Sequence, residues 1–548
     1  MLDWLDSLGP KPDHPMHNIG AAKKLLSGLS PDPVKALEEI ASWLGTVTAT
    51  AGYRPTNRIA IVRLLDETGR PFEPQLVRLY LSPGALKEFE RLHVWQAALE
   101  FWERLADAYR LCRTEVRQDE KSAHALAAEQ PLLIARELRA LAEQTRLLHL
   151  RYLPVRARIW ETLFEVYRAG ETAGCDIQRL HAYADDALQT TPRQEFLRAL
   201  MLDAASPESM LAPQVELAAR IAGRFSDSFL FRTAPEADCN WAIDLDHPHR
   251  PLQTGGTTHA AASARFFGAG IAIAKMEEVI GRLTTDPEEK EKRFGDDFSP
   301  QAKLLALKHL KLYWGAQPPH RREPRRNVRA ELAVAHGFKP ALHLVPRIEF
   351  SGMAEITRTM DVKLKEKLGL HLAAAEVHIP TEKWFEQNAS TWGLGVDIPR
   401  PSEGWVRIGA LCALKGGAQS WSIGAVRRLY RDSENHEHAG IEVLAKKPVS
   451  VWLRGIGEGA ALAENWATSS GSFAFDYLNV ILLGESAHSA QRHELLLARG
   501  LFHAGITYEA MMGETPPYLK FEEVLEEGED FDRVRFTWAA GKPQAQRA

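Results

Sequence analysis

Hydrophobic residues recur at helical spacing through the first part of the chain. Asp32 is suited to capping a helix and Pro33 to its first position. The apolar residues at 34, 37, 40, 41 and 44 fall on one helical face, and Gly45 is expected to end the helix. We expect residues 1–210 to form an all-α domain, because further helical patterns cover 57–66, 83–118, 120–150 and 155–170.

From about residue 211 the pattern becomes mixed. Helical segments remain, but short strand-like pieces at 229–231 and 241–244 come between them, so residues 211–315 predict a second, mainly helical domain. This region ends at the Gly-Ala-Gln-Pro-Pro break at 315–319, which is followed by the basic run at 320–329. The break and the charge run predict a basic hinge over 316–330.

Beyond the hinge, apolar and polar residues alternate with period two. Alternating stretches lie at 332–336, 405–410, 421–426, 441–445 and 449–453. Short strands separated by glycine-bearing turns predict a small antiparallel β-barrel over 331–460. Residues 353–376 have a helical pattern and are expected to be an insertion between barrel strands. A β-rich extension over 461–540 either enlarges the barrel or forms a second one, so the predicted fold class is α+β and multidomain, with an α-helical N-terminal region.

The composition and charge of the chain exclude several classes of function. A formal net charge of −5 argues against a general nucleic-acid binder, which needs a large basic face. The four cysteines are far apart and include no CxxC pair, so neither a disulfide framework nor a zinc site is expected. The amino terminus lacks the apolar stretch of a signal peptide, and the longest apolar run, 266–274, is far shorter than the roughly 20 residues of a membrane helix. We expect a cytoplasmic protein without a membrane span.

The chain carries no convincing catalytic or metal-binding motif. It contains no P-loop, and the GIGEG segment at 455–459 lacks the spacing of a dinucleotide fingerprint. The GESAH segment at 484–488 imitates a nucleophile elbow but has histidine in place of the second glycine. The aspartates and histidines at 244–249 do not follow a metal-site spacing. We therefore expect no enzyme activity, no metal and no cofactor.

The most informative stretch is the short polar sequence Asn388-Ala389-Ser390-Thr391-Trp392-Gly393. An amide, a hydroxyl two residues later and a glycine three residues beyond that predict a tight turn, which can hold an anion against backbone N–H groups. Asn388 and Ser390 supply short hydrogen-bonding groups, and Gly393 lets the backbone approach a ligand closely.

Arginines upstream of this turn complete the candidate site. Pairs of arginines four positions apart occur several times in the chain, so that spacing alone has little value. Among these pairs, Arg325 and Arg329 are the one that ends shortly before the predicted strand starting at 331.

Together these features resemble a PilZ domain, a bacterial receptor module for cyclic di-GMP. The resemblance covers roughly 320–460 and rests on the arginine pair, the turn at 388–393 and the strand-like segments 405–409 and 438–443. It implies a small antiparallel barrel with cyclic di-GMP as its ligand, held by Arg325, Arg329, Asn388, Ser390 and Gly393. The chain departs from the family pattern in the β-rich extension and in the 58 residues between Arg329 and Asn388, which we attribute to the helical insertion.

The resulting hypothesis is a cytoplasmic receptor and effector for cyclic di-GMP. Binding of the nucleotide by the hinge and the barrel would reorient the helical region, which is expected to have a protein partner. The alternative is a degenerate PilZ adaptor that binds no nucleotide and acts through protein–protein contacts. Neither hypothesis involves nucleic acid, and the sequence does not indicate an oligomeric state.

Overall fold

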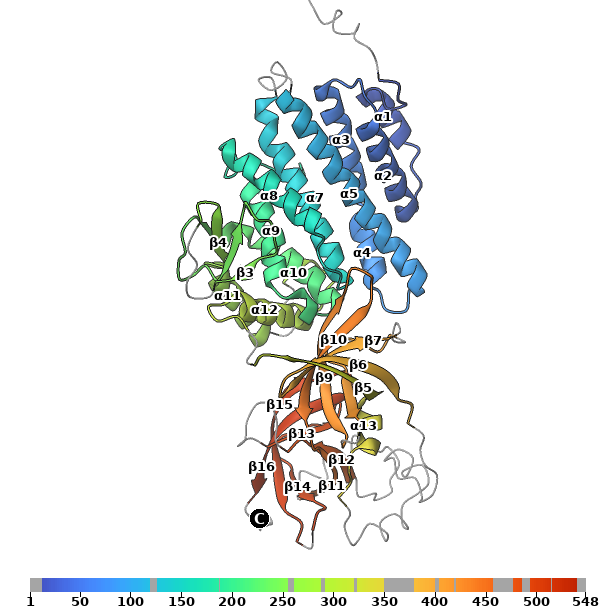
Figure 1. Cartoon of the computed structure of the whole chain (residues 1–548), viewed down its shortest axis with the longest axis vertical. Coiled ribbons are helices and arrows are strands. Elements are labelled where there is room, and N and C mark those ends of the chain that lie inside the picture. Colours follow the sequence, from blue (N-terminus) through green and yellow to red (C-terminus); the bar gives the residue numbers. More distant parts are fainter. Residues whose placement is uncertain are drawn as a thin grey trace, which may run out of the picture. The chain divides into compact units, whose positions relative to one another are not determined.

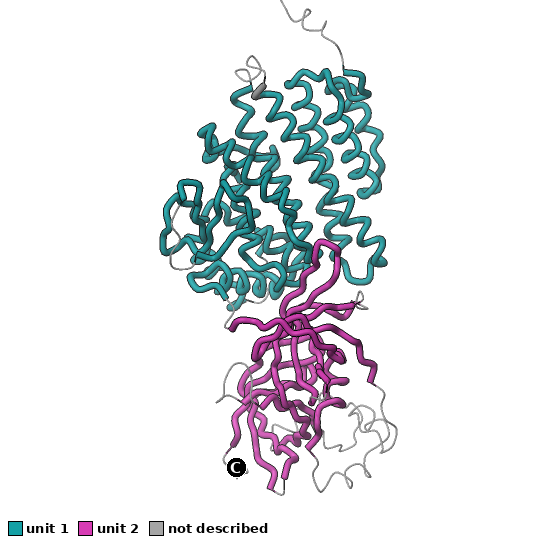
Figure 2. Tube along the Cα trace, in the orientation of Figure 1, with its two compact units in different colours: residues 1–320 teal, residues 321–548 magenta. Residues whose placement is uncertain are grey.

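The structure is a computed structural model, and the residues it describes are 12–118, 126–186, 188–254, 261–286, 291–319, 323–348, 379–399, 404–417, 420–456, 477–484, 493–513 and 515–539. The chain divides into two compact units, residues 1–320 and residues 321–548 (Figure 2). Helices dominate the first unit and strands the second (Figure 1). Among the described helices, none combines the length and the apolar character that a membrane span requires.

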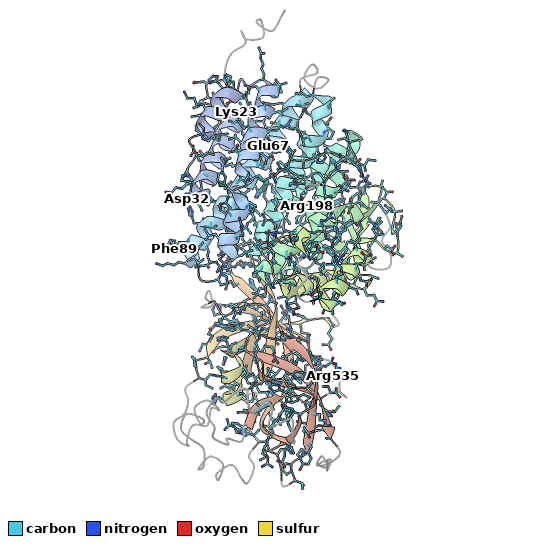
Figure 3. The ribbon with its side chains drawn as sticks, turned by 180° about the vertical axis from the view of Figure 1, so that it is seen from behind. Lys23, Asp32, Glu67, Phe89, Arg198 and Arg535 are labelled. Carbon is cyan, nitrogen blue, oxygen red and sulfur yellow. The ribbon has the colours of Figure 1, made fainter. Side chains whose placement is uncertain are left out.

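The helices of the first unit include the one predicted around Asp32. Asp32 is labelled in Figure 3. Its side chain accepts hydrogen bonds from the backbone N–H groups of Val34 and Lys35 at the start of α2. The predicted end at Gly45 is wrong: α2 continues to Ala49, because a glycine inside a helix costs only about 1 kcal/mol and the next turn buries Val47. The described helices of this unit are α1 (Ile19–Leu26), α2 (Pro33–Ala49), α3 (Pro55–Gly69), α4 (Glu73–Leu81), α5 (Glu88–Gln118), α7 (Gln130–Leu150), α8 (Ala157–Thr172), α9 (Pro192–Ala204), α10 (Ala212–Arg224), α11 (Ala272–Thr285) and α12 (Pro300–Trp314).

Helix α7 packs against α5, α8, α9 and α10 and buries charged side chains that are paired with its neighbours. Arg136 pairs with Asp66 of α3 at 3.2 Å, and Arg139 pairs with Glu195 of α9 at 2.7 Å. Burial alone would raise the pKa of Glu195, but the charge of Arg139 outweighs it and lowers that pKa to about 2. Because removal of one partner would leave a buried charge uncompensated, these pairs fix how α3 and α9 pack on α7.

A small antiparallel sheet follows α10. Its spatial order is β1-β4-β2-β3, and Phe266 and Phe267 of β4 are buried. The strand-like pieces predicted at 229–231 and 241–244 correspond to its first two strands. The strands are β1 (Leu230–Arg232), β2 (Trp241–Asp244), β3 (Leu252–Gln253) and β4 (Ala264–Gly268).

The second unit begins with a closed antiparallel barrel of six strands in the order β10-β7-β6-β5-β8-β9. The predicted fold class, a helical N-terminal region followed by an antiparallel barrel, is confirmed. One boundary differs from the prediction: residues 326–329 belong to β5 and not to a hinge, because they already pair with β6, with Asn327 opposite Asn388. The strands are β5 (Arg326–His336), β6 (Glu382–Ala389), β7 (Gly393–Ile398), β8 (Leu411–Gly416), β9 (Ser422–Arg431) and β10 (Glu437–Ala445).

Two expectations about the first barrel concern the segments between its strands. The stretch at 405–409 is not a strand, because residues 407–410 form a turn with Gly409 at φ 86°, and β8 begins only at Leu411. Trp405 in this stretch stacks on Trp384 instead, with 5.3 Å between the ring centroids. The helical insertion predicted at 353–376 lies outside the described residues.

The β-rich extension forms a second closed barrel, in the order β11-β12-β13-β16-β15-β14. The two barrels therefore divide before residue 449 and not at 460, since β11 pairs with β12 and β14. Numbered in chain order, both barrels pair their first strand with the second and fourth, and their sixth with the third and fifth. The second barrel thus repeats the connectivity of the first. Its strands are β11 (Val449–Ile456), β12 (Tyr477–Leu482), β13 (His493–Ala498), β14 (Thr507–Ala510), β15 (Tyr518–Glu527) and β16 (Phe531–Ala539).

The barrels pack against each other through outer faces. Ile481, Leu496 and Phe531 of the second barrel share one buried cluster with Leu411 and Ile423 of the first and with the short helix α13 (Phe338–Leu344). They lie on β12, β13 and β16, the strands that take the places of β6, β7 and β10 of the first barrel. That face of the second barrel is therefore covered by protein.

Candidate functional site

The candidate site lies where β6 turns into β7. Ala389 ends β6 and Gly393 starts β7, so the predicted polar turn is the connection of this hairpin. The backbone N–H of Ser390 closes the turn by donating to the carbonyl of Gly393 at 2.7 Å. The backbone N–H of Val443 donates to the carbonyl of Trp392 at 3.0 Å, which ties the turn to β10.

Arg325 contacts the first residue of this turn sequence. Its Nη1 donates a hydrogen bond to Oδ1 of Asn388 at 2.7 Å, and the arginine is half-buried. The two residues are 63 positions apart in the chain. The structure therefore brings the basic run and the polar turn together on one side of the barrel.

Glycines from two neighbouring strands lie beneath the Arg325 guanidinium group. Gly395 of β7 and Gly440 of β10 are directly opposite each other, and Gly393 lies two residues before Gly395. A Cβ atom on Gly395 would lie 2.8 Å from Nη1 of Arg325 and 2.5 Å from Oδ1 of Asn388. Because real side chains do not approach so closely, glycine at 395 is what allows the guanidinium group to lie against the sheet. We call Gly393, Gly395 and Gly440 the glycine floor.

A second arginine borders the glycine floor. Arg428 of β9 is opposite Gly440, and a Cβ atom on that glycine would lie 3.2 Å from the Cβ of Arg428. The register of β9 and β10 shifts here by one residue, which is typical of a β-bulge. The preceding Arg427 pairs with Glu442 at 2.7 Å and with Glu526 of the second barrel. Arg428 thus lies beside the glycine floor, whereas the adjacent Arg427 forms an ion pair with the second barrel.

The turn already holds an anion from within the chain. Oε2 of Glu323 accepts a hydrogen bond from the backbone N–H of Thr391 at 3.0 Å. Hydrogen bonding from Thr391 lowers the pKa of the Glu323 carboxyl, and the charge of Lys446 adds to this effect. Lys446 lies over the ring of Trp392, with Nζ 4.7 Å from the ring centroid. The turn therefore presents a backbone N–H group and a nearby cation to a carboxylate, and binding of a separate anionic ligand there stays a prediction.

Arg329 is placed differently from the other predicted site residues. It lies in β5 between Asn327 and Ala330, where the pairing with β6 shifts register, and it is exposed. Within the described part of the chain, no hydrogen bond or ion pair is formed by its guanidinium group. The structure gathers Arg325, Asn388, Ser390 and Gly393 at the turn and leaves Arg329 on the adjoining strand.

Sequence reasoning did not single out two glycines of the floor. The signal for Gly395 is present, because glycines at 393 and 395 occupy alternate positions of one strand and leave one face of it bare. Gly440 could not be found in this way. Its role depends on the register between β7 and β10, which are not consecutive in the chain.

One comparison with known proteins bears on the first unit. Residues 20–236 match the family model described as "Cyclic-di-GMP receptor FimW, N-terminal domain". The match covers less than half of the chain, ends shortly after β1 and includes none of the barrel residues. No curated protein matches the chain. The helical region is therefore similar to the N-terminal domain of a cyclic di-GMP receptor.

Replacing Gly395 with alanine should separate Arg325 from Asn388. The barrel should still fold, because Gly395 does not have the left-handed backbone that only glycine tolerates. A crystal structure of Gly395→Ala should show the hydrogen bond from Arg325 to Asn388 broken. Gly393→Ala is the matched control for the arginine, since its Cβ would lie 3.7 Å from Nη2 of Arg325, an ordinary contact, and its tighter contact, 3.2 Å, is with Oγ of Ser390. A hydrogen bond that persists at 2.7 Å in Gly395→Ala would contradict the steric account.

Proposed function

We propose that this protein is a receptor for cyclic di-GMP and that its first barrel is a PilZ domain. The observation that carries the proposal is the contact between Arg325 and Asn388 at 2.7 Å, above the glycine floor. It joins the two motifs on which the family resemblance rests. The match of residues 20–236 to the N-terminal domain of a cyclic di-GMP receptor supports the proposal independently, because the matched residues lie outside the barrel.

The chemistry of the site suits this ligand. Cyclic di-GMP presents two phosphates and two guanine bases, and arginine can bind both by hydrogen bonding and by stacking. Arg325 and Arg428 supply two such groups beside a floor without side chains, and the exposed Arg329 on β5 supplies a third. Hydrogen bonds to charged groups contribute about 1.5–3 kcal/mol each. Three or four of them with stacking would support micromolar binding, about −8 kcal/mol.

Among its described residues, the second barrel offers no equivalent place for the nucleotide. On the strands that correspond to β7 and β10, Glu494 and Arg533 form a buried ion pair at 2.6 Å, and Leu496 is buried in the cluster between the barrels. Side chains therefore fill the surface that glycines leave open in the first barrel. We infer one nucleotide site per chain.

Calorimetric titration with cyclic di-GMP tests the proposal. We expect one binding process in the wild-type protein, loss of at least about tenfold in affinity for Arg325→Ala and a smaller loss for Arg329→Ala, because a charged hydrogen bond contributes about 1.5–3 kcal/mol. Arg326→Ala is the matched control, since Arg326 is the exposed residue that follows Arg325 and begins β5. Absence of binding to the wild-type protein would reject the proposal and favour the adaptor alternative, whereas unchanged affinity in Arg325→Ala would reject the assignment of the site.

The carboxylate of Glu323 should compete with the nucleotide for the turn. Glu323→Gln removes the negative charge beside the Thr391 N–H, so we expect affinity for cyclic di-GMP to rise about two- to fivefold, the range of exposed charge contacts. Glu331→Gln serves as the control, because Glu331 is an exposed carboxylate of the same segment that pairs with Lys383 instead. Weaker binding by Glu323→Gln in calorimetry would show that the carboxylate supports the ligand and does not compete with it.

Binding at this site would act on the helical unit through the connecting segment. Because β5 starts at Arg326, the segment that remains between the units is shorter than the predicted hinge, and Arg325 and Glu323 stand at its end. We propose that the nucleotide holds this segment on the barrel and so reorients the helical unit toward its protein partner. Small-angle X-ray scattering should show a change in radius of gyration on addition of cyclic di-GMP to the wild-type protein and none for Arg325→Ala. An unchanged scattering profile at saturating nucleotide would exclude this mechanism.

A further inference from the structure

A row of larger side chains lies beside the glycine floor on the same face of the barrel. Two residues further along the strands, Asp397 of β7 is opposite His438 of β10, just as Gly395 is opposite Gly440. The row continues to Tyr430 of β9, opposite His438, and to Phe385 of β6, opposite Asp397. Residues opposite each other in an antiparallel pair, and residues two apart in a strand, share one side of the sheet. We call Asp397, His438, Tyr430 and Phe385 the second row.

The carboxylate of Asp397 is held in place but remains accessible. Its Oδ1 lies 2.6 Å from Nδ1 of His438, and its Oδ2 accepts a hydrogen bond from Nε2 of Gln387 at 2.6 Å. The Asp397 side chain is 34% exposed, whereas that of His438 is 10% exposed. Each carboxylate oxygen can accept two hydrogen bonds, so both oxygens keep one acceptor position for an incoming donor.

Two exposed rings stand at the ends of the second row. Tyr430 is 42% exposed and stacks on His438, with 4.6 Å between the ring centroids and 11° between the planes. Phe385 is 48% exposed. Exposed aromatic rings beside a basic groove are the usual stacking surface for unpaired bases. The chemistry of the second row is therefore that of base recognition and not of phosphate binding.

We propose that Asp397 selects guanine by accepting hydrogen bonds from its N1–H and N2–H₂ groups. The inference rests on the proposed function, in which arginines at the floor hold the phosphates and the other edge of the base. The second row lies about 7 Å from the floor, two residues along the strands, so a base held at the floor turns an edge toward Asp397. Adenine presents an acceptor, N1, where guanine presents a donor, and a carboxylate that can only accept hydrogen bonds rejects it.

The test compares cyclic di-GMP with cyclic di-AMP by calorimetry on the full chain. The wild-type protein should prefer cyclic di-GMP, and Asp397→Asn should reduce the ratio of the two affinities by roughly tenfold or more, as expected for loss of a two-point base contact. Asp432→Asn is the matched control. Oδ2 of Asp432 also lies 3.4 Å from His438, but outside the row, so this variant should keep the wild-type ratio.

The outcomes separate this inference from the proposed function. If cyclic di-GMP binds in an Arg325-dependent manner but Asp397→Asn keeps the wild-type ratio, or weakens both nucleotides equally, Asp397 has only a structural role and the inference is wrong. If the wild-type protein binds neither nucleotide, both proposals are wrong. Asp397→Ala should lose the preference in the same way and serves as the second variant if Asp397→Asn does not fold.

Discussion

The Arg325 guanidinium group lies against the outer face of the first barrel at a point where the strands beneath it carry no side chains. Gly395 provides this condition on β7 and Gly440 provides it on β10, because the register places the two glycines opposite each other. One added Cβ at 395 would collide with both Arg325 and Asn388. The position of Arg325 against the sheet therefore depends on this pair of glycines.

The two barrels share one connectivity but use the equivalent face differently. In the first barrel that face carries glycines and arginines, whereas in the second it carries Leu496 and the buried pair of Glu494 and Arg533. Two adjacent arginines of β9 take part in the candidate site and in the contact between the barrels, one in each. Arg428 borders the glycine floor while Arg427 pairs with Glu526 of the second barrel, so β9 contributes both to the candidate site and to the contact between the barrels.

Local features of the fold could be predicted from the sequence because they depend on neighbouring residues. The cap at Asp32 and the tight turn after Asn388 are examples, since each is made by side chains within a few positions of the backbone groups they contact. The predicted helix end at Gly45 failed because burial of Val47 outweighs the low helix propensity of glycine. Local propensity is a weak guide wherever tertiary burial acts on the same residues.

Features that depend on strand register could not be predicted in this way. The start of β5 at Arg326 is set by pairing with β6, across a long stretch of intervening chain. Gly440 and Asp397 gain their roles only through strands that meet at a distance in sequence. The candidate residues of the turn and of the basic run could be identified from the sequence. The glycine floor could not, because it depends on how β7 and β10 pair in three dimensions.

The most direct test of the central claim is a crystal structure of the full chain with cyclic di-GMP. The account predicts the nucleotide on the outer face of the first barrel, with a base beside Arg325 above Gly395 and Gly440 and with a phosphate at the Thr391 N–H in place of Glu323. A nucleotide bound to the second barrel or to the helical unit, with Glu323 still on Thr391, would contradict it.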